Sequence, residues 1–275
     1  MEIRRLATPE EYLEAERLQQ AVWHFPDREV IPLNELVMLQ KHGGHVFGAF
    51  EGGKMTGFCF GNPAYRDGKA YHYSRMLGVL PGSQDSGIGH QLKLQQRQYV
   101  LEQGLDLVMW TFDPLQSRNA YLNIEKLGCV VRDYVVNVYP ASDSQFNRGL
   151  ESDRFTPEWW IKSRRVKERL AGKRKPHDLD AWVPVLAGRA NDKGLLEPEV
   201  ARLKLREKRV RIEIPDDIDH VKKKNLQVAQ KWRFETREAF VAYFKRGYVV
   251  TGLATKPEVD RRRSFYLLEK GLRVR

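Results

Sequence analysis

The sequence predicts an α/β fold with a mixed sheet (α+β), and three observations carry that prediction. Helical and strand-like segments alternate along the chain. The short turns "EGGK" at 51–54 and "RDGK" at 66–69 join strand-like runs and indicate antiparallel hairpins. The continuous apolar run "LDLVMWTF" at 105–112 is typical of a strand buried on both faces.

The first 140 residues predict the element order β, α, α, β, β, β, α, β, α, β. Thr8 is the expected N-cap of the first helix and Pro9 its first residue. Gly43 and Gly44 end the second helix. The expected segments are a strand at 2–7, helices at 9–23 and 32–42, three strands within 45–81, a helix at 87–103, a strand at 105–112, a helix at 117–127 and a strand at 129–139.

Composition indicates a globular chain without a membrane segment. Of the 275 residues, 41% are hydrophobic, and no apolar run approaches the roughly 20 residues that span a bilayer. The first residues, "MEIRRLATPEEYLEA", lack the apolar core of a signal peptide. Cys59 and Cys129 lie inside apolar segments and lack metal-ligand spacing, which predicts two buried thiols and no metal site. We therefore expect a cytoplasmic protein.

The second part of the chain differs in charge and predicts a second unit. The net charge is −2 over residues 1–140 and +13 over 141–275, so affinity for anions is expected in the second part. We expect a loop at 141–149, a strand at 153–163 interrupted by Pro157 and a basic helix at 164–176. A strand at 209–215, a helix at 219–246 and strands at 248–254 and 264–270 follow.

The stretch "VLPGSQDSGIG" at 79–89 lies between a predicted strand and a predicted helix. The N–H groups of residues 86–90 begin the helix and lack partners there, which favours an anion. Gly87 and Gly89 would let a diphosphate approach the backbone, and Ser86 would add a hydroxyl donor. A tight turn without a ligand is the alternative interpretation. The spacing of the glycines fits neither the dinucleotide-binding fingerprint nor the phosphate-binding loop of nucleoside triphosphatases.

This stretch resembles the V-x-P-x-x-[QR]-x-x-G-x-[GA] motif of the GNAT superfamily of acyl-CoA-dependent N-acyltransferases, with Gln84, Gly87 and Gly89 at the signature positions. The resemblance covers about residues 2–163, and "WTFDPLQSRNAYLNIEKLG" at 110–128 is similar to a branch of predicted GNAT acetyltransferases. It implies a GNAT domain at 1–163, a basic C-terminal domain at 164–275, and a sheet splayed between the strands at 69–80 and 105–112.

The resemblance further implies acetyl-CoA, or another acyl-CoA, as cosubstrate. The pantetheine arm would pair with the backbone of Leu77 and Val79, and Asn119 and Asn123 would be further contacts. The diphosphate would lie on the turn formed by Gln84, Asp85, Ser86, Gly87, Ile88, Gly89 and His90. Asp85 departs from the family pattern, because a carboxylate beside a diphosphate weakens binding unless it points to solvent.

The family chemistry is direct attack of an amine on the thioester, with an oxyanion donor expected near Leu77. The expected position of the base falls on Tyr73 and Arg75. His72 lies on the opposite face by strand alternation unless a bulge redirects it. The family's acid, a tyrosine, is replaced by Ile124. Tyr121, three residues earlier and nearly on the same helical face, is the substitute candidate, with simple packing as the alternative.

The segment "TREAFVAYFKRGY" at 236–248 repeats the spacing of the corresponding GNAT helix, with Tyr243 at the acid position. No Gly-x-Gly turn follows residue 90, so we expect a degenerate, partial GNAT-like repeat. Its basic runs are either solvated faces or a surface for an anionic acceptor or nucleic acid. The sequence thus favours an N-acetyltransferase acting on a primary amine of an unknown acceptor. The alternative is a binding protein that has lost catalysis.

Overall fold

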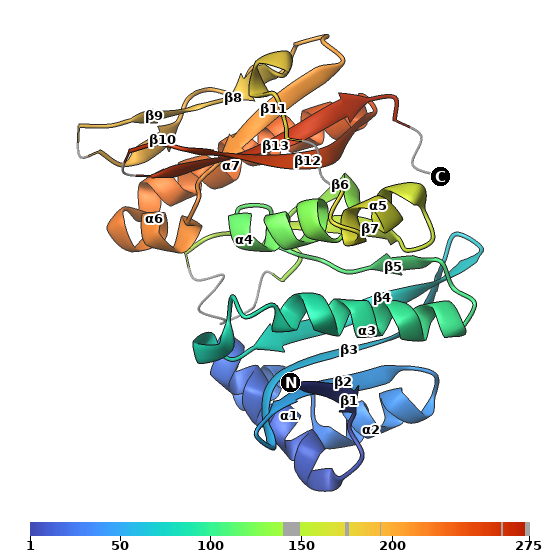
Figure 1. Cartoon of the computed structure of the whole chain (residues 1–275). Coiled ribbons are helices and arrows are strands. Elements are labelled where there is room, and N and C mark those ends of the chain that lie inside the picture. The colour runs from blue at the N-terminus through green and yellow to red at the C-terminus, as the bar shows by residue number, and fades with distance from the viewer. Residues whose placement is uncertain (140–148, 174–175, 193, 260, 273–275) are drawn as a thin grey trace. The chain divides into compact units, whose positions relative to one another are not determined.

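The computed structural model describes residues 1–139, 149–173, 176–192, 194–259 and 261–272 (Figure 1). It divides the chain into two compact units. The first unit contains residues 1–110 and 160–162, and the second contains the other described residues. The predicted limits of 1–163 and 164–275 stay a prediction. The loop expected at 141–149 falls almost wholly on residues outside the described part.

The first unit is a mixed sheet of the strand order β1-β2-β3-β4-β5. Neighbouring strands from β1 to β4 are antiparallel, whereas β4 and β5 are parallel. A mixed α/β fold is therefore confirmed. The elements are β1 (Glu2–Arg5), α1 (Pro9–Trp23), α2 (Leu33–Lys41), β2 (His45–Glu51), β3 (Lys54–Arg66), β4 (Lys69–Val79), α3 (Ile88–Glu102) and β5 (Leu107–Met109), with single 3₁₀ turns at Asp27–Glu29 and Pro81–Ser83.

Both faces of this sheet are covered by helices. Thr8 caps α1 by accepting a hydrogen bond from the Glu11 N–H at 3.4 Å, and Pro9 is the first helical residue, as expected. One cluster of buried side chains joins α1 and α2 to the sheet, including Tyr12, Leu36 and Phe58. A second cluster on the other face includes Ile88 and Leu92 of α3. Because both faces are buried, β2 is buried at every residue except its last.

The described part of the second unit is larger and contains a six-stranded sheet, a separate two-stranded hairpin, four α-helices, one π-helical turn and one 3₁₀ turn. Its sheet has the order β7-β6-β12-β13-β11-β8, and β9 pairs with β10 in a separate hairpin. The elements are α4 (Ser117–Ala120), a π-helical turn (Tyr121–Lys126), β6 (Val130–Val135), β7 (Arg154–Trp160), α5 (Arg164–Leu170), a 3₁₀ turn (Leu179–Ala181), β8 (Val183–Leu186), β9 (Gly188–Ala190), β10 (Leu196–Pro198), β11 (Arg209–Ile214), α6 (Ile218–Lys224), α7 (Leu226–Lys245), β12 (Tyr248–Pro257) and β13 (Arg262–Lys270).

Helix α7 packs on the sheet of the second unit through aromatic side chains. The Phe240 ring meets the Phe155 ring edge to face, with centroids 4.7 Å apart, and the Tyr266 ring at 5.3 Å. Trp232 and Tyr243 of the same helix are fully buried. Offset and edge-to-face pairs of this kind add about 0.5–1.5 kcal/mol each beyond the area that they bury. These contacts form the core of the second unit.

The second unit contains the strands and the long helix predicted for it in the expected order along the chain, and their likeness to a GNAT domain stays a prediction. β11, α7, β12 and β13 follow one another, β13 lies between β12 and β11, and β8 is parallel to β11. The strand β8 is followed by the hairpin strand β9, not by a helix. Within the described residues, no counterpart of the turn at 84–90 follows β8.

Several elements differ from the sequence expectation. The strand predicted at 105–112 is limited to Leu107–Met109. The helix predicted at 219–246 is two helices, because Asn225 has an extended backbone with φ −158° and its Oδ1 accepts the N–H groups of Gln227 and Val228. The short strands β8, β9 and β10 were not predicted. None of the helices in the described part of the chain combines the length and the apolar character that crossing a bilayer requires.

Candidate active site

The backbone of the turn between β4 and α3 leaves the first N–H groups of the helix without acceptors inside the helix. Asp85 and Gly87 have φ values of 65° and 88°, in the left-handed region. The first N–H bonded within α3 is that of Gln91, which donates to the Gly87 carbonyl at 3.0 Å. The N–H groups of Ile88 and Gly89 precede it and have no acceptor inside the helix. The geometry is therefore that of an anion-binding helix start.

Gly89 has no structural need to be glycine, unlike Gly87. A Cβ atom at Gly89 would meet the Leu77 side chain at 3.4 Å and the Val79 side chain at 3.8 Å, which are ordinary contacts. The φ of Gly89 is not positive, so neither strain nor a clash excludes a larger residue. A glycine here instead keeps the first turn of α3 free of side-chain atoms, as a closely approaching ligand requires.

The other turn residues are placed less favourably for binding through side chains. The Ser86 hydroxyl donates to the Ser83 carbonyl at 2.6 Å, so its hydrogen is used within the turn, and the expected extra donor from Ser86 is not supported. Gln84 Nε2 donates to the Val79 carbonyl at 3.3 Å. The side chain of Ile88 is buried, and Asp85 is exposed to solvent. Backbone groups are the main donors of this turn.

At the end of β4, the backbone groups of Leu77 and Val79 point to the edge of the strand that faces away from β3. The Leu80 N–H donates to the Thr56 carbonyl at 2.9 Å. Because hydrogen bonds to a given neighbour alternate along an antiparallel pair, the backbone groups of Leu77 and Val79 point away from β3. On that side β5 pairs with β4 at His72 and Tyr73 and ends at Met109. β4 continues to Val79, so its last residues face the splay between the two strands.

Lys93 of α3 lies at the point where the two strands separate. Its side chain is buried, and its Nζ donates to Ser74 Oγ at 2.9 Å and to Gln96 Oε1 at 3.0 Å. The same Nζ lies 3.6 Å from the centroid of the Trp110 ring, a cation–π contact. Ser74 follows the last paired residue of β4, and Trp110 follows that of β5. Lys93 thus connects α3 to both strands. The sequence analysis did not identify it, because its partners come from distant segments.

His72 and Tyr73 lie on opposite faces of β4, as strand alternation predicts. His72 is fully buried and stacks on His45 with ring centroids 4.9 Å apart. Neither ring nitrogen of His72 has a hydrogen-bond partner among the described residues. Burial, assisted by the charge of Lys93, lowers the pKa of His72 to about 3. A neutral, buried imidazole of this kind is a weak base.

A β-bulge in β4 lies next to these residues. Ser74 pairs with Gly61 and Met76 with Phe60, so Arg75 is the additional residue, and its side chain is exposed. The bulge comes after His72 in the chain and leaves the His72 ring directed at α3. There the His72 ring also contacts the ring of Tyr99, with the two centroids 6.5 Å apart. Tyr73 is half-buried on the other face. Of the two candidates for the base, Tyr73 is the accessible one.

Three predicted site residues, Asn119, Tyr121 and Asn123, belong to the second unit. Asn119 and Tyr121 are exposed, whereas Asn123 is buried. Ile124, at the family's acid position, is fully buried, and Tyr121 is 38% exposed. The Leu127 N–H donates to the Leu122 carbonyl, a π-helical bond that changes the phase of this segment. The expectation that Tyr121 and Ile124 share a face assumed α-helical spacing and is not met.

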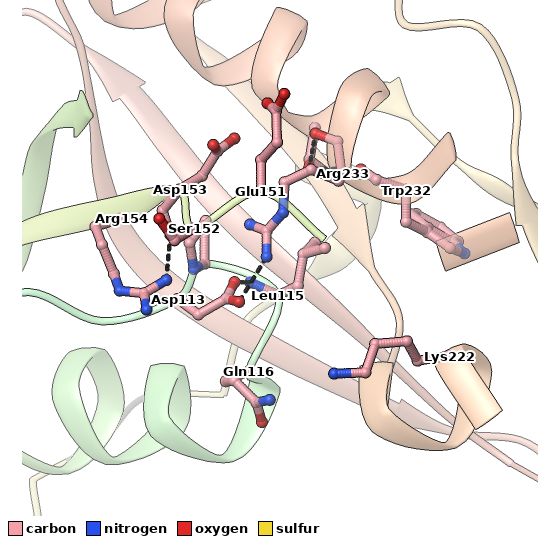
Figure 2. Close-up of polar contacts among 12 residues, drawn as sticks. Asp113, Leu115, Gln116, Glu151, Ser152, Asp153, Arg154, Lys222, Trp232 and Arg233 are labelled. Atoms are coloured by element: carbon pink, nitrogen blue, oxygen red, sulfur yellow. Dashed lines mark hydrogen bonds and ion pairs between the residues drawn. The ribbon is translucent and has the colours of Figure 1, made fainter. Parts of the chain in front are cut away.

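The loop before α4 is held by residues from the C-terminal part of the second unit. Figure 2 shows the guanidinium group of Arg233 directed at the carboxylate of Asp113. The Arg233 Nη2 to Asp113 Oδ2 distance is 2.5 Å, and Arg233 is 1% exposed. Burial lowers the pKa of Arg233, but Asp113 outweighs that effect and the net shift is upward. Tyr266 Oη also donates to the Pro114 carbonyl, and Gln116 Nε2 to Asp219.

Glu125 is a buried carboxylate that the sequence analysis did not identify. It is 4% exposed, forms an ion pair with Arg169 at 2.9 Å and accepts the backbone N–H of Leu253. His177 Nε2 lies 3.1 Å from Glu125 Oε1, the oxygen that also accepts the Leu253 N–H, whereas Arg169 contacts Oε2. Burial raises the pKa of Glu125, but these partners outweigh burial and lower it overall. Because every partner lies inside the second unit, Glu125 has a structural role there.

Comparison with known proteins assigns the first part of the chain. Residues 2–128 match the model of the acetyltransferase (GNAT) family.

Over these residues, a little under half of the chain, the protein is similar to the GNAT family.

The match includes β4, the turn and α3, and it confirms the resemblance expected from the motif at 79–89. The GNAT family model ends before β6, so the remaining residues are outside it. Acyl transfer is the general activity of GNAT proteins. No curated protein sequence matches the chain.

Solved structures of acetyltransferases resemble the chain at low sequence identity. An aminoglycoside 6'-acetyltransferase of type Ii is 18% identical and covers 60% of this chain and 99% of its own, with a TM-score of 0.48. The ribosomal-protein-S18-alanine N-acetyltransferase of Escherichia coli is 19% identical and covers 59% of this chain and 94% of its own, with a TM-score of 0.47. A ribosomal-protein-alanine N-acetyltransferase of Brucella melitensis is 17% identical, covers 57% of this chain and 98% of its own, and has a TM-score of 0.46.

Proposed function

We propose that the protein is an N-acyltransferase that moves an acyl group from an acyl-CoA, acetyl-CoA in the first place, to a primary amine. One observation carries the proposal. The outward-facing backbone of Leu77 and Val79 continues directly into the open helix start at Gly87, Ile88 and Gly89. A pantetheine arm paired along the strand edge would bring its diphosphate to the N-terminus of α3.

The proposed reaction is direct transfer. The amine nitrogen attacks the thioester carbonyl carbon, a new C–N bond forms, and the C–S bond breaks as coenzyme A leaves as a thiolate. The backbone N–H of Leu77 is the expected donor to the oxyanion. One proton must leave the amine and one must reach the thiolate. Tyr73, directly or through water, is the proposed route for the first, and Tyr121 stays a prediction for the second.

The decisive experiment compares coenzyme A binding in two glycine variants. Gly89→Val places a side chain over the first turn of α3 and should weaken binding at least tenfold, as expected when an anion loses close backbone donors. Gly82→Val is the matched control, because nothing lies within 4 Å of its added Cβ and its φ is not positive. Titration calorimetry with acetyl-CoA measures both. Equal affinities in the two variants would contradict the proposed diphosphate site.

A second candidate function is a GNAT-fold binding protein without catalysis. It is favoured by the buried, uncharged His72 and by Ile124 at the acid position. A thiol-release assay with acetyl-CoA and a panel of primary amines separates the two. Amine-dependent release of coenzyme A supports the transferase. Tight acetyl-CoA binding without release for any amine in the panel supports the binding protein.

A further inference from the structure

The second unit contains a cavity of about 200 Å³ at the ends of two parallel strands. β8 and β11 run in the same direction, with Ile212 opposite Leu186 at their carboxyl ends. Leu186, Ala187 and Glu213 line the cavity there. Ligands of open α/β sheets bind outside the carboxyl ends of parallel strands. By their parallel pairing, β8 and β11 resemble β4 and β5, which flank the splay of the first unit.

The cavity lies on the face of the sheet opposite to α7. Phe265 lines it, and the next residue, Tyr266, points to the other face, where it meets Phe240 of α7. On the cavity face, Phe265 packs in a small cluster with Trp182, Ala254 and Leu267, and Leu179 packs against that cluster. The cavity therefore combines an aromatic floor with the apolar side chains of Leu179 and Leu186.

Three cationic side chains from adjacent strands line the same cavity: Arg211 of β11, Arg263 of β13 and Lys256 of β12. Arg263 is engaged by the fully buried carboxylate of Glu213, with its Nε 2.5 Å from Oε1. Glu213 also accepts the Gly188 N–H at 2.7 Å. This pair neutralises itself and fixes the wall of the cavity.

Arg211 and Lys256 leave positive charge in the cavity. Arg211 Nη1 donates to the Leu179 carbonyl, and its guanidinium lies 5.6 Å from the Phe265 ring centroid. Among the described residues, neither Arg211 nor Lys256 has an acidic partner. Asp180 also lines the cavity and is exposed. Arg263 also pairs with Glu258, whose Oε1 lies 3.4 Å from its Nη1, so the positive charge that faces a ligand is that of Arg211 and Lys256. The apolar floor suits the carbon part of a small molecule.

We propose that this cavity is a second ligand site that binds a small organic carboxylate, with its charge held by Arg211 and Lys256 and its apolar part against Phe265. Two features separate this ligand from acyl-CoA. The cavity is small, and β8 is followed by a hairpin strand, which provides no helix N-terminus for a diphosphate. The site does not depend on the proposed transfer reaction.

Benzoate is the probe for the test, and benzamide is its uncharged match. Titration calorimetry of the full chain should show saturable binding of benzoate at one site and binding of benzamide at least tenfold weaker. Saturating coenzyme A should leave benzoate binding unchanged, because the proposed sites differ. Equal affinity for benzoate and benzamide, displacement of benzoate by coenzyme A, or inorganic phosphate binding as tightly as benzoate would each overturn the proposal.

Substitutions of the cavity residues test where benzoate binds. Lys256→Met and Arg211→Met should each weaken benzoate binding about tenfold, as loss of a charge-assisted contact predicts, and should leave coenzyme A binding unchanged. Arg206→Met, at an exposed arginine of the same unit, is the control and should change neither affinity. Because Arg211 also bonds to the Leu179 carbonyl, the exposed Lys256 provides the variant that leaves the fold intact. Unchanged benzoate affinity in Lys256→Met would contradict the site.

Discussion

Lys93 shows how one side chain sets the geometry of the proposed cleft. Its ammonium group bonds to Ser74 of β4 and lies over Trp110, the residue after β5. It therefore joins α3 to both strands at the residues where their pairing ends. A buried cation held by neutral partners costs desolvation energy, and the contacts to a hydroxyl, an amide oxygen and an indole ring offset that cost.

Replacement of Lys93 by methionine should destabilise the first unit. The variant keeps a chain of similar length but leaves Ser74 Oγ and Gln96 Oε1 buried with one donor fewer, which costs about 1–3 kcal/mol. Urea unfolding measures the loss, and acetyl-CoA should bind more weakly to the same variant. Lys41→Met, at an exposed lysine of α2, is the control. Equal unfolding midpoints for the two variants would show that Lys93 does not hold the strands.

His72 makes the free energy of unfolding depend on pH. The pKa of His72 in the folded chain is about 3, below the value of about 6.5 in an unfolded chain. The unfolded chain therefore binds the proton first, and the free energy of unfolding falls as the pH drops from about 6.5 towards 3. The slope is about 1.4 kcal/mol per pH unit for one such group. Burial also lowers the pKa of the neighbouring His45.

The variant His72→Phe should lack the part of the decrease in unfolding free energy at low pH that protonation of His72 causes. Phenylalanine keeps a ring next to His45, so the free energy of unfolding should decline less steeply between pH 6 and pH 4 than in the native chain. Guanidinium unfolding at several pH values provides the measurement. His42→Gln, at an exposed histidine, should keep the native slope. An unchanged slope in His72→Phe would mean that its imidazole titrates normally.

At the scale of elements, the loop from Asp113 to Ser117 is positioned by helices more than 90 residues further along the chain. Asp113 binds Arg233 of α7, and Gln116 binds Asp219 of α6, with sequence separations of 120 and 103. Asn119, Tyr121 and Asn123 follow this loop directly. The C-terminal part of the chain therefore fixes the segment that carries three predicted site residues, whatever ligand that segment meets.

Breaking the Asp113 to Arg233 pair should cost more than removing both partners. Arg233→Met leaves the Asp113 carboxylate, whose side chain is 16% exposed, without its cation; removal of one partner of a buried ion pair typically costs about 3–5 kcal/mol. Asp113→Asn keeps an acceptor for the Leu115 N–H. The double variant should be less destabilised than the sum of the two single variants, and a double-mutant cycle by urea unfolding measures the difference. Additive effects would indicate that the pair contributes no coupling.

The π-helical turn is another element whose effect reaches the site. The α-helical period places Tyr121 near Ile124. The bond from the Leu127 N–H to the Leu122 carbonyl spans five residues and alters that period. Composition contains no signal for such a turn, because it depends on which backbone acceptor each N–H finds when the helix packs.

At the scale of the whole molecule, local patterns predicted most of the N-terminal elements and fewer of those in the second unit. The caps and breakers around α1, α2 and α3 are short-range signals and lie at the expected positions. The strands β8, β9 and β10 have three or four residues each, too short for periodicity to identify them. The cationic cavity could not be predicted from the sequence either, because Arg211, Lys256 and Arg263 come together only across neighbouring strands.

By itself, the sequence determined the mixed fold, the GNAT motif and the backbone chemistry of the turn at 84–90. These depend on glycine, capping residues and apolar alternation, which act over a few positions of the chain. Only the tertiary structure decided that His72 is buried and uncharged, that Lys93 connects β4 and β5, and that Arg233 holds the loop at Asp113. Burial and charge pairing depend on residues that are distant in sequence, and folding alone makes them neighbours.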